Sequence, residues 1–161
     1  MIRKVKPEDA HDIAAIYNYY IENSTITFET SYVSTEEMAC RIADITEKYP
    51  YFVNEESGKV VGYCYVSSWK KKAAYNKTVE STVYIDKDFL GKGLGRALMN
   101  KLINELREKS FHAVIACITT PNPTSVKLHE ELGFKHVSEF REVGYKFGKW
   151  LDVGDWELLL Q

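Results

Sequence analysis

Hydrophobic and polar residues alternate at every second position over residues 78–85, and the spacing then changes to that of a helix. One face of the first segment carries Val79, Ser81, Val83 and Ile85, and the other carries Thr78, Glu80, Thr82 and Tyr84. Alternation among β-branched residues predicts a β-strand. Apolar residues at positions 98, 102, 103 and 106 recur at helical spacing and predict an amphipathic helix. We expect the rest of the chain to be organised around this strand and helix.

The flanking sequence predicts further strands and helices in alternation. Strands are expected at residues 2–6, 51–54, 60–67 and 114–118, the second and third of which form a hairpin. Helices are expected from Pro7, from a capping box at Ser34 to about residue 48, and from about residue 124 to Leu132 with Gly133 as the C-cap. The tail from Lys135 is expected to be strand-like and broken at Gly144, Gly148 and Gly154. This order predicts an α/β fold with a central mixed sheet and helices on both faces.

Three glycines, Gly91, Gly93 and Gly95, separate the predicted strand from its helix. Such a turn exposes backbone N–H groups at the positive end of the helix dipole, which favours a phosphate or pyrophosphate. The spacing G-x-G-x-G matches neither the Walker pattern nor the dinucleotide fingerprint, and no carboxylate ends the next apolar run. A turn that only reverses the chain is the alternative.

Composition limits the remaining possibilities. A length of 161 residues suits one domain with a hydrophobic core. The net charge of −2 provides no basic surface for nucleic acid. No apolar run reaches the roughly 18 residues that a membrane span needs, and the polar N-terminus does not fit a signal peptide. We therefore expect a cytoplasmic protein that binds neither nucleic acid nor membrane.

The three cysteines, Cys40, Cys64 and Cys117, are far apart and odd in number. This spacing predicts buried thiols in a reducing compartment, with no disulfide framework and no zinc site. No metal is expected.

The glycine turn, taken with residues 122–134, resembles the GNAT superfamily of N-acetyltransferases. In that family a Q/R-x-x-G-x-G/A loop binds the pyrophosphate of acetyl-CoA, and the matching run here is Leu90-Gly91-Lys92-Gly93-Leu94-Gly95, with Leu90 in place of Gln or Arg. The resemblance implies one GNAT domain over residues 1–161 and acetyl-CoA as co-substrate. The residues it assigns to acetyl-CoA are Val83, Tyr84, Ile85, Gly91, Lys92, Gly93, Leu94, Gly95, Arg96, Asn122 and Ser125. The backbone of Val83 and Ile85 would pair with the pantetheine arm as a strand does. From the residues alone, Asn122 would fit a turn or a helix lead-in.

Five local runs resemble the phosphinothricin N-acetyltransferases within that superfamily. They are Phe28 after Ser24-Thr25, Trp69-Lys70 with Ala74-Tyr75, residues 78–84, Leu128-His129-Glu130, and residues 144–154. Those enzymes acetylate the amino group of phosphinothricin and of related amino acids such as methionine sulfoximine. The resemblance also implies a homodimer, to which the aromatic tail between Trp150 and Trp156 would contribute.

Glu80 is the candidate general base. A carboxylate in the middle of a strand is costly unless it is paired or lies in a cleft, although an outward position on a half-exposed sheet is the simpler explanation. An amine must be neutral before it attacks a thioester, and a carboxylate of raised pKa can remove its proton. The resemblance implies that the base is Glu80 and that attack is direct, in a ternary complex.

His129 is a second catalytic candidate, because the phosphinothricin subfamily has histidine at this place and it is implicated there in catalysis. Many GNAT members instead carry a tyrosine that protonates the leaving thiolate. A lone histidine in a helix is more often structural, and acid, base and water-mediated roles all stay open.

The resemblance implies that Phe28, Lys70, Lys72 and Tyr75 bind the substrate, the lysines by holding its acidic groups. From the residues alone, a basic run is usually a solvated face and the aromatic residues could be core. Lys72 stands where these enzymes often have arginine, and lysine is a point charge without the bidentate fork. A GNAT acting on a peptide or protein amine and a non-catalytic acetyl-CoA-binding module are the alternative functions.

Overall fold

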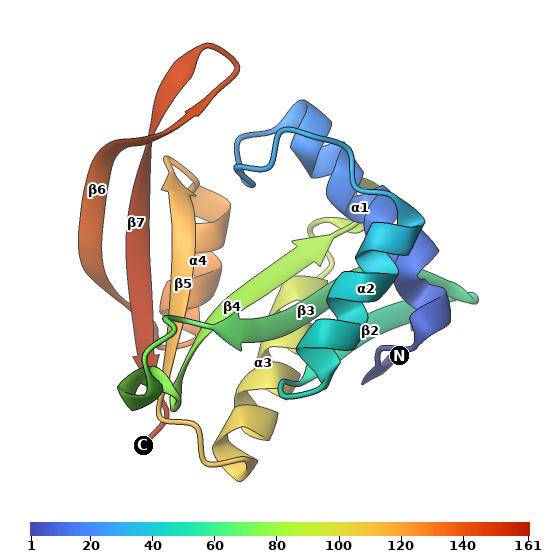
Figure 1. Cartoon of the computed structure of the whole chain (residues 1–161), viewed down its shortest axis with the longest axis horizontal. Coiled ribbons are helices and arrows are strands. Elements are labelled where there is room, and N and C mark those ends of the chain that lie inside the picture. Colours follow the sequence, from blue (N-terminus) through green and yellow to red (C-terminus); the bar gives the residue numbers. More distant parts are fainter.

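The computed structural model describes residues 1–161 and contains one seven-stranded sheet in the order β1-β2-β3-β4-β5-β7-β6 (Figure 1). The strands are β1 (Ile2–Lys4), β2 (Tyr51–Glu56), β3 (Lys59–Ser68), β4 (Thr78–Ile85), β5 (Ala113–Thr120), β6 (Lys135–Lys146) and β7 (Lys149–Leu159). The helices are α1 (Ala10–Asn23), α2 (Thr35–Thr46), α3 (Leu94–Glu108) and α4 (Pro123–Glu131), with short 3-10 turns η1 (Pro7–Asp9), η2 (Ala73–Tyr75) and η3 (Lys87–Phe89). Neighbouring strands are antiparallel except β4 and β5, which are parallel. The predicted mixed sheet is confirmed.

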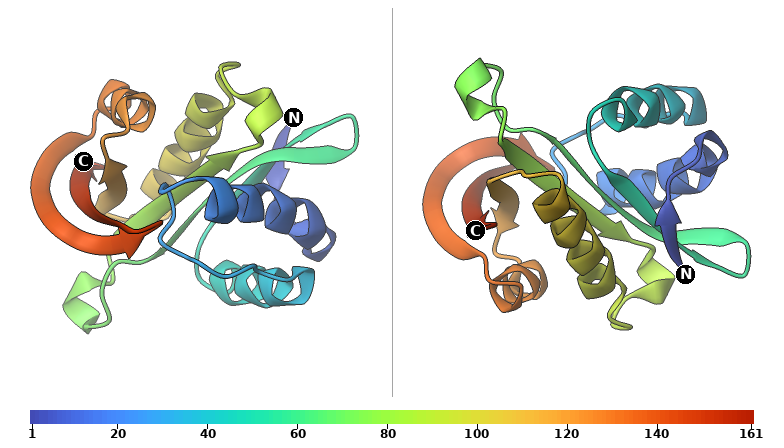
Figure 2. Two further views of the ribbon diagram at one scale, coloured as in Figure 1. Left: turned by 90° about the horizontal axis from the view of Figure 1, so that it is seen from above. Right: turned by 90° about the horizontal axis from the view of Figure 1, so that it is seen from below.

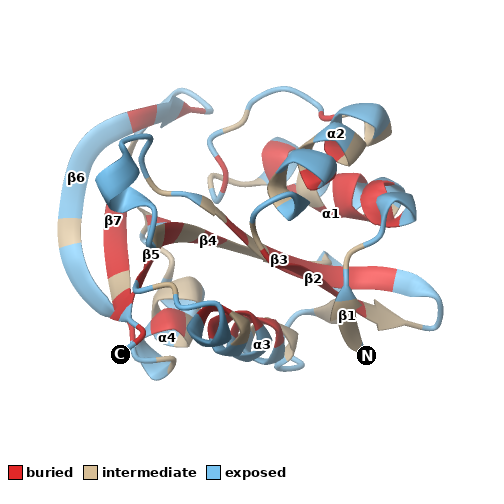
Figure 3. Cartoon of the chain, turned by 60° about the horizontal axis from the view of Figure 1, so that its bottom comes forward, coloured by how far each residue is buried: buried red, intermediate tan, exposed pale blue.

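Helices cover both faces of the sheet. Helices α1 and α2 lie on one face, and α3 and α4 lie on the other (Figures 2 and 3). The alternation of β4 divides its side chains between two cores: Val79 belongs to the core under α3, and Tyr84 packs against the core under α1 and α2. The predicted apolar stripe of α3 is buried, with Leu98, Leu102 and Leu106 fully inaccessible. Periodicity therefore identified the faces of both central elements correctly.

The C-terminal tail differs from its predicted form. It is a long hairpin, and of the three glycines only Gly148, at a φ of 71°, lies in its turn. Gly144 and Gly154 lie inside strands, where a Cβ atom would overlap the Phe28 ring and the Trp156 ring, respectively. The predicted break at Gly154 is wrong, because the glycine there makes room for a packed aromatic ring. At Gly144 the strand continues, but its pairing with β7 shifts register between Phe140 and Gly144.

Two other expectations need correction. Cys64 is buried, but Cys40 and Cys117 are exposed, the first on α2 and the second on β5. Trp156 is buried in the core, so of the two tryptophans that bound the aromatic tail only Trp150 is accessible. None of the helices has both the length and the apolar character that crossing a membrane requires.

Candidate active site

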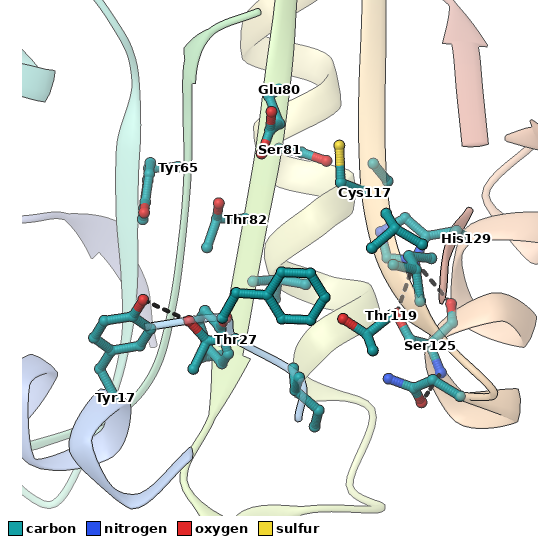
Figure 4. Close-up of a pocket in the computed structure, with 18 residues that line it drawn as sticks. Tyr17, Thr27, Tyr65, Glu80, Ser81, Thr82, Cys117, Thr119, Ser125 and His129 are labelled. Carbon is teal, nitrogen blue, oxygen red and sulfur yellow. Dashed lines mark hydrogen bonds between the residues drawn. The ribbon is translucent and has the colours of Figure 1, made fainter. Parts of the chain in front are cut away.

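The sheet opens between its two parallel strands. Strand β4 pairs with β5 only from Thr78 to Glu80, whereas β5 continues beside β7 as far as Thr120. A cleft of about 360 Å³ fills the gap. It is lined by Tyr17, Ile26, Thr27, Phe28, Tyr65, residues 80–84, residues 116–119, Asn122, Ser125, His129 and Val153 (Figure 4). The cleft therefore lies where the carboxyl ends of parallel strands meet the starts of the following helices, a common ligand position in α/β sheets.

The backbone of β4 presents unpaired groups to this cleft. The N–H group of Asp86 donates to the Val61 carbonyl oxygen at 2.8 Å, so alternate residues of β4 direct their N–H and C=O groups to β3. By the same alternation Ser81, Val83 and Ile85 direct theirs to the side from which β5 has separated. The Ile85 carbonyl oxygen accepts a hydrogen bond from the Tyr20 hydroxyl. The pairing of Glu80 with Ile115 still uses the Ser81 N–H group, so the strand edge becomes free at Val83, where it can pair with an extended ligand. The backbone of Tyr84 is used by β3.

The glycine turn precedes α3 and provides a second binding feature. Gly91 and Gly93 have φ values of 75° and 78°, which side chains rarely adopt, and no atom lies within 4 Å of an added Cβ at either position. Gly93 caps α3 without a side-chain hydrogen bond, so the first N–H groups of the helix are free for an anion. Gly95 differs, because a Cβ there would make ordinary contact with Leu128 of α4. These features fit the pyrophosphate and pantetheine of acetyl-CoA.

The polar side chains of the turn have partners on the protein. Arg96 forms an ion pair with Glu131 of α4, and the Lys92 amine lies 4.5 Å from the centre of the Phe89 ring. Leu90 is exposed. An anion at this turn would therefore meet mainly backbone N–H groups, with the Lys92 charge beside them.

Glu80 lies in the wall of the cleft, where β4 and β5 separate (Figure 4). Burial raises the pKa of its carboxyl group; a hydrogen bond with the Cys117 thiol opposes this increase, and the negative charge of Asp155 adds to it. A carboxylate with a raised pKa is a better proton acceptor near neutral pH. Glu80 is half-buried, and it faces the cleft.

His129 is buried, 4% exposed, and also lines the cleft. Its Nδ1 atom lies 2.8 Å from the Ser125 carbonyl oxygen, which can only accept, so Nδ1 carries the proton. Burial lowers the pKa of His129, against the opposing effect of this hydrogen bond. The neutral ring therefore has an unprotonated Nε2, which accepts a proton and has none to donate.

Asn122 and Ser125 stand at the start of α4. The Asn122 side-chain oxygen accepts the Ser125 N–H at 3.2 Å and so caps the helix, as the helix lead-in interpretation suggested. Both residues also line the cleft, which leaves the Asn122 amide N–H groups free for a ligand.

The residues expected to bind substrate do not all come together. Phe28 lines the cleft, but Lys70, Lys72 and Tyr75 do not, and no lysine or arginine is among the lining residues. The Lys70 amine lies 5.5 Å from the Trp69 ring centre and 5.4 Å from that of Tyr75, on an exposed segment next to the Glu80 end of β4. No three His, Cys, Asp or Glu side chains are grouped as metal ligands, and the absence of a metal remains a prediction.

Sequence reasoning missed polar groups that lie on or beside the cleft wall: Tyr17, Tyr65, Thr82, Cys117 and Asp155. Asp155 gave one available signal, since it is a charged residue next to Trp156 in a strand-like segment. The residues that face Asp155 could not be predicted, because they depend on the order of the strands in the sheet.

An open pair of parallel strands beside a glycine turn defines an enzyme class that binds an extended, phosphate-containing co-substrate. Residues 2–154 match the family model described as acetyltransferase (GNAT) domain. The chain belongs to the GNAT acetyltransferases.

Individual relatives agree with this assignment. The chain is 40% identical over 157 residues to a phosphinothricin N-acetyltransferase of Streptomyces viridochromogenes, covering 96% of this chain and 86% of the relative. It is 36% identical to an L-methionine sulfoximine/L-methionine sulfone acetyltransferase of Salmonella typhimurium, covering 99% and 94%. The chain is thus an N-acetyltransferase closely related to enzymes named for amino-acid analogues.

Solved structures match the whole fold. A phosphinothricin acetyltransferase from Sinorhizobium meliloti in complex with acetyl-CoA superposes with a TM-score of 0.95 at 34% identity, covering 99% of this chain and 87% of the other. A ribosomal-protein-alanine N-acetyltransferase from Brucella melitensis superposes with a TM-score of 0.97 at 31% identity, covering 99% of both chains.

Proposed function

We propose that this chain transfers the acetyl group of acetyl-CoA to the amino group of a small amino-acid analogue similar to phosphinothricin or methionine sulfoximine, with Glu80 as general base. The observation that carries the proposal is the position of Glu80. Its carboxylate lies in the cleft wall, partly shielded from water, where the unpaired edge of β4 begins. A base at this point reaches an amine that enters from one side while the co-substrate lies along β4.

The reaction needs three contributions from the chain. Glu80 accepts a proton from the substrate ammonium, which leaves a neutral nitrogen with a free electron pair. Acetyl-CoA, when bound along β4 and the glycine turn, supplies the activated acetyl group. The free N–H group of β4 at Val83 is available to the acetyl oxygen, where negative charge develops. His129 serves as a hydrogen-bond or proton acceptor through Nε2.

Direct attack by the amine is favoured over an acyl-enzyme. The only cysteine in the cleft wall is Cys117. Its residue surface is exposed, but partial loss of water around the thiol, together with the charges of Glu80 and Asp155, raises the pKa of the thiol. A thiol that stays protonated is a poor nucleophile. The acetyl group is therefore transferred within a ternary complex. The nitrogen–carbon bond forms as the carbon–sulfur bond breaks, and the coenzyme A thiolate leaves and takes up the second proton that the nitrogen releases.

The substrate class rests on the relatives. Proteins that cover almost all of this chain are named for phosphinothricin, methionine sulfoximine and methionine sulfone. The cleft adds Phe28 as an apolar wall and the hydroxyl groups of Tyr17, Tyr65 and Thr82 as polar contacts. Lys70 and Lys72 would approach the acidic groups of the substrate from the segment beside the Glu80 end.

A protein or peptide amine is the second candidate substrate. It is favoured by the absence of lysine and arginine from the cleft lining, because a free amino acid brings a carboxylate that needs a partner. The similar fold of the ribosomal-protein-alanine N-acetyltransferase agrees with it.

Turnover with acetyl-CoA across a panel of amines separates the candidates. The panel contains phosphinothricin, methionine sulfone, the free amino acids and a short peptide with an alanine N-terminus. We expect the highest kcat/KM for a free amino acid or analogue. Acetylation of the peptide alone would support the second candidate, and binding of acetyl-CoA without any turnover would support the non-catalytic module.

A further inference from the structure

Four neighbouring strands present polar side chains in one row on the cleft face of the sheet: Glu80 from β4, Cys117 from β5, Asp155 from β7 and Ser138 from β6. Cys117 lies directly opposite Asp155, and Asp155 lies directly opposite Ser138. Glu80 is paired with Ile115, two residues before Cys117 and therefore on the same face. The row connects the proposed base to the far edge of the sheet.

Asp155 has no counter-ion. It is 8% exposed, it accepts the Ser138 hydroxyl at 2.7 Å, and no lysine, arginine or histidine forms an ion pair with it. A buried carboxylate without a cation destabilises a fold. Packing alone therefore gives no reason for an aspartate at this position.

Cys117 lies between the two carboxylates. Strand register places its side chain between Glu80 and Asp155 on one face of the sheet. Loss of water around the thiol, followed by the negative charges of the two carboxylates, raises the pKa of the thiol. The protonated thiol can donate to only one oxygen at a time. It therefore orients Glu80 while it separates the two negative charges.

No positive charge faces Glu80 from any element around it. Strand β3 contributes Tyr65, whose pKa is raised by burial, although a hydrogen bond with Thr82 opposes the increase. Strand β5 contributes Cys117, and β7 contributes Asp155. The surroundings of Glu80 are thus neutral or negative.

We propose that Cys117 and Asp155 are positioning residues for Glu80: the thiol directs the carboxylate, and the charge of Asp155 makes that carboxylate a stronger base. This inference rests on the proposed role of Glu80 as base. It assigns Asp155 and Cys117 opposite effects, because a nearby negative charge favours the protonated form of Glu80 and a hydrogen-bond donor favours the ionised form.

The pH profile of kcat/KM tests these opposite effects. Activity falls on the acid side as Glu80 becomes protonated. We call the pH range over which activity falls on the acid side the acid limb. Asp155→Asn removes the neighbouring charge, so the acid limb should move to lower pH. The maximal kcat/KM should fall by less than the roughly 10²-fold expected for loss of the base itself. Cys117→Ala removes the donor, so the limb should move to higher pH, and Cys117→Ser should restore it.

Asp152→Asn is the matched control. It removes the same charge from the same strand, about 10 Å away by strand geometry, and Asp152 accepts the Glu142 N–H instead of facing Glu80. Its acid limb should stay at the wild-type position. The inference would be overturned if the acid limbs of Asp155→Asn and Cys117→Ala stayed at the wild-type pH or moved in the same direction. If Asp155→Asn does not fold, the comparison of Cys117→Ala with Cys117→Ser decides alone.

A direct titration keeps this inference separate from the proposed function. Carbon-13 NMR of the Glu80 carboxyl group reports its pKa without any turnover. Opposite shifts in the two variants support the inference whether or not Glu80 is the base. An unmoved Glu80 signal in both variants, with Glu80→Gln inactive, would overturn the inference and leave the proposed function standing.

Discussion

The Tyr20 hydroxyl on α1 donates a hydrogen bond to the carbonyl oxygen of Ile85, the last residue of β4, across 65 positions of sequence. Tyr20 is buried, and its ring packs at 5.4 Å from that of Tyr84. The bond satisfies a carbonyl group that β5 would otherwise pair. It therefore stabilises β4 at the end where the strand is open on one side.

Tyr20→Phe should lower the free energy of unfolding by about 1–3 kcal/mol, because the Ile85 carbonyl then loses its partner in a partly buried position. Urea unfolding measures this change. Tyr19→Phe is the matched control, since Tyr19 is 38% exposed and its hydroxyl makes no hydrogen bond to the protein. Equal losses in the two variants would contradict the structural role of the Tyr20 hydroxyl.

Glu80→Gln should lower turnover by about 10²–10⁴-fold, because glutamine has the same shape but cannot accept the proton. Acetyl-CoA affinity should stay near the wild-type value, and higher pH should partly restore turnover because more of the substrate amine is then neutral. Turnover measured against pH, together with a binding titration, checks both expectations. Turnover close to that of the wild type at neutral pH would rule out the base.

Glu80→Gln should also stabilise the folded protein at neutral pH. The folded-state pKa of Glu80 is raised by burial, so folding favours its protonated form, and its contribution is fully present below about 4.5 and is lost as pH rises through the folded pKa. The melting temperature of the variant should exceed that of the wild type near neutral pH, and the difference should disappear below about pH 4.5. A structural glutamate would give the opposite sign.

Gly95→Asp should reduce the thermal stabilisation that acetyl-CoA provides, because the new carboxylate lies beside the helix N–H groups assigned to the pyrophosphate. Gly95 suits this test better than Gly93, since its φ is not in the left-handed region and a Cβ meets Leu128 at an ordinary 3.5 Å. Gly95→Asn is the control for size, and it should retain more of the shift. A full shift in Gly95→Asp would remove the turn from the co-substrate site.

Trp150→Glu should convert the expected homodimer into a monomer. Trp150 is 63% exposed and packs at a tilt against the Tyr145 ring. Exposed apolar neighbours continue along the hairpin at Phe140, Val143 and Phe147. Exposed patches of this kind mark interaction surfaces. Light scattering at micromolar concentrations measures the mass, and Leu159→Glu, at the far end of the same strand, is the control. A monomeric wild-type protein would contradict the dimer.

Sequence by itself determined the elements whose pattern is local. Alternation over residues 78–85 identified both faces of β4, and helical spacing identified the buried stripe of α3, because neighbours along one strand or helix decide which side chains share a face. The glycine turn was recognised for the same reason. At Ser34, whose side chain accepts the Glu37 N–H at 3.0 Å, the local capping signal was also sufficient.

Only the tertiary structure decided what lies beside Glu80 and how the tail folds. Cys117 lies beside Glu80 because β5 pairs with β4, and Asp155 comes next because β7 inserts between β5 and β6. No local pattern specifies that order. Glycines in a sequence usually indicate turns, but Gly144 and Gly154 lie in strands. The rings of Phe28 and Trp156 occupy the space that a side chain at these positions would need, and this packing cannot be seen in the sequence. Strand order and side-chain packing minimise the free energy of the whole chain, so they become visible only when distant segments are placed together.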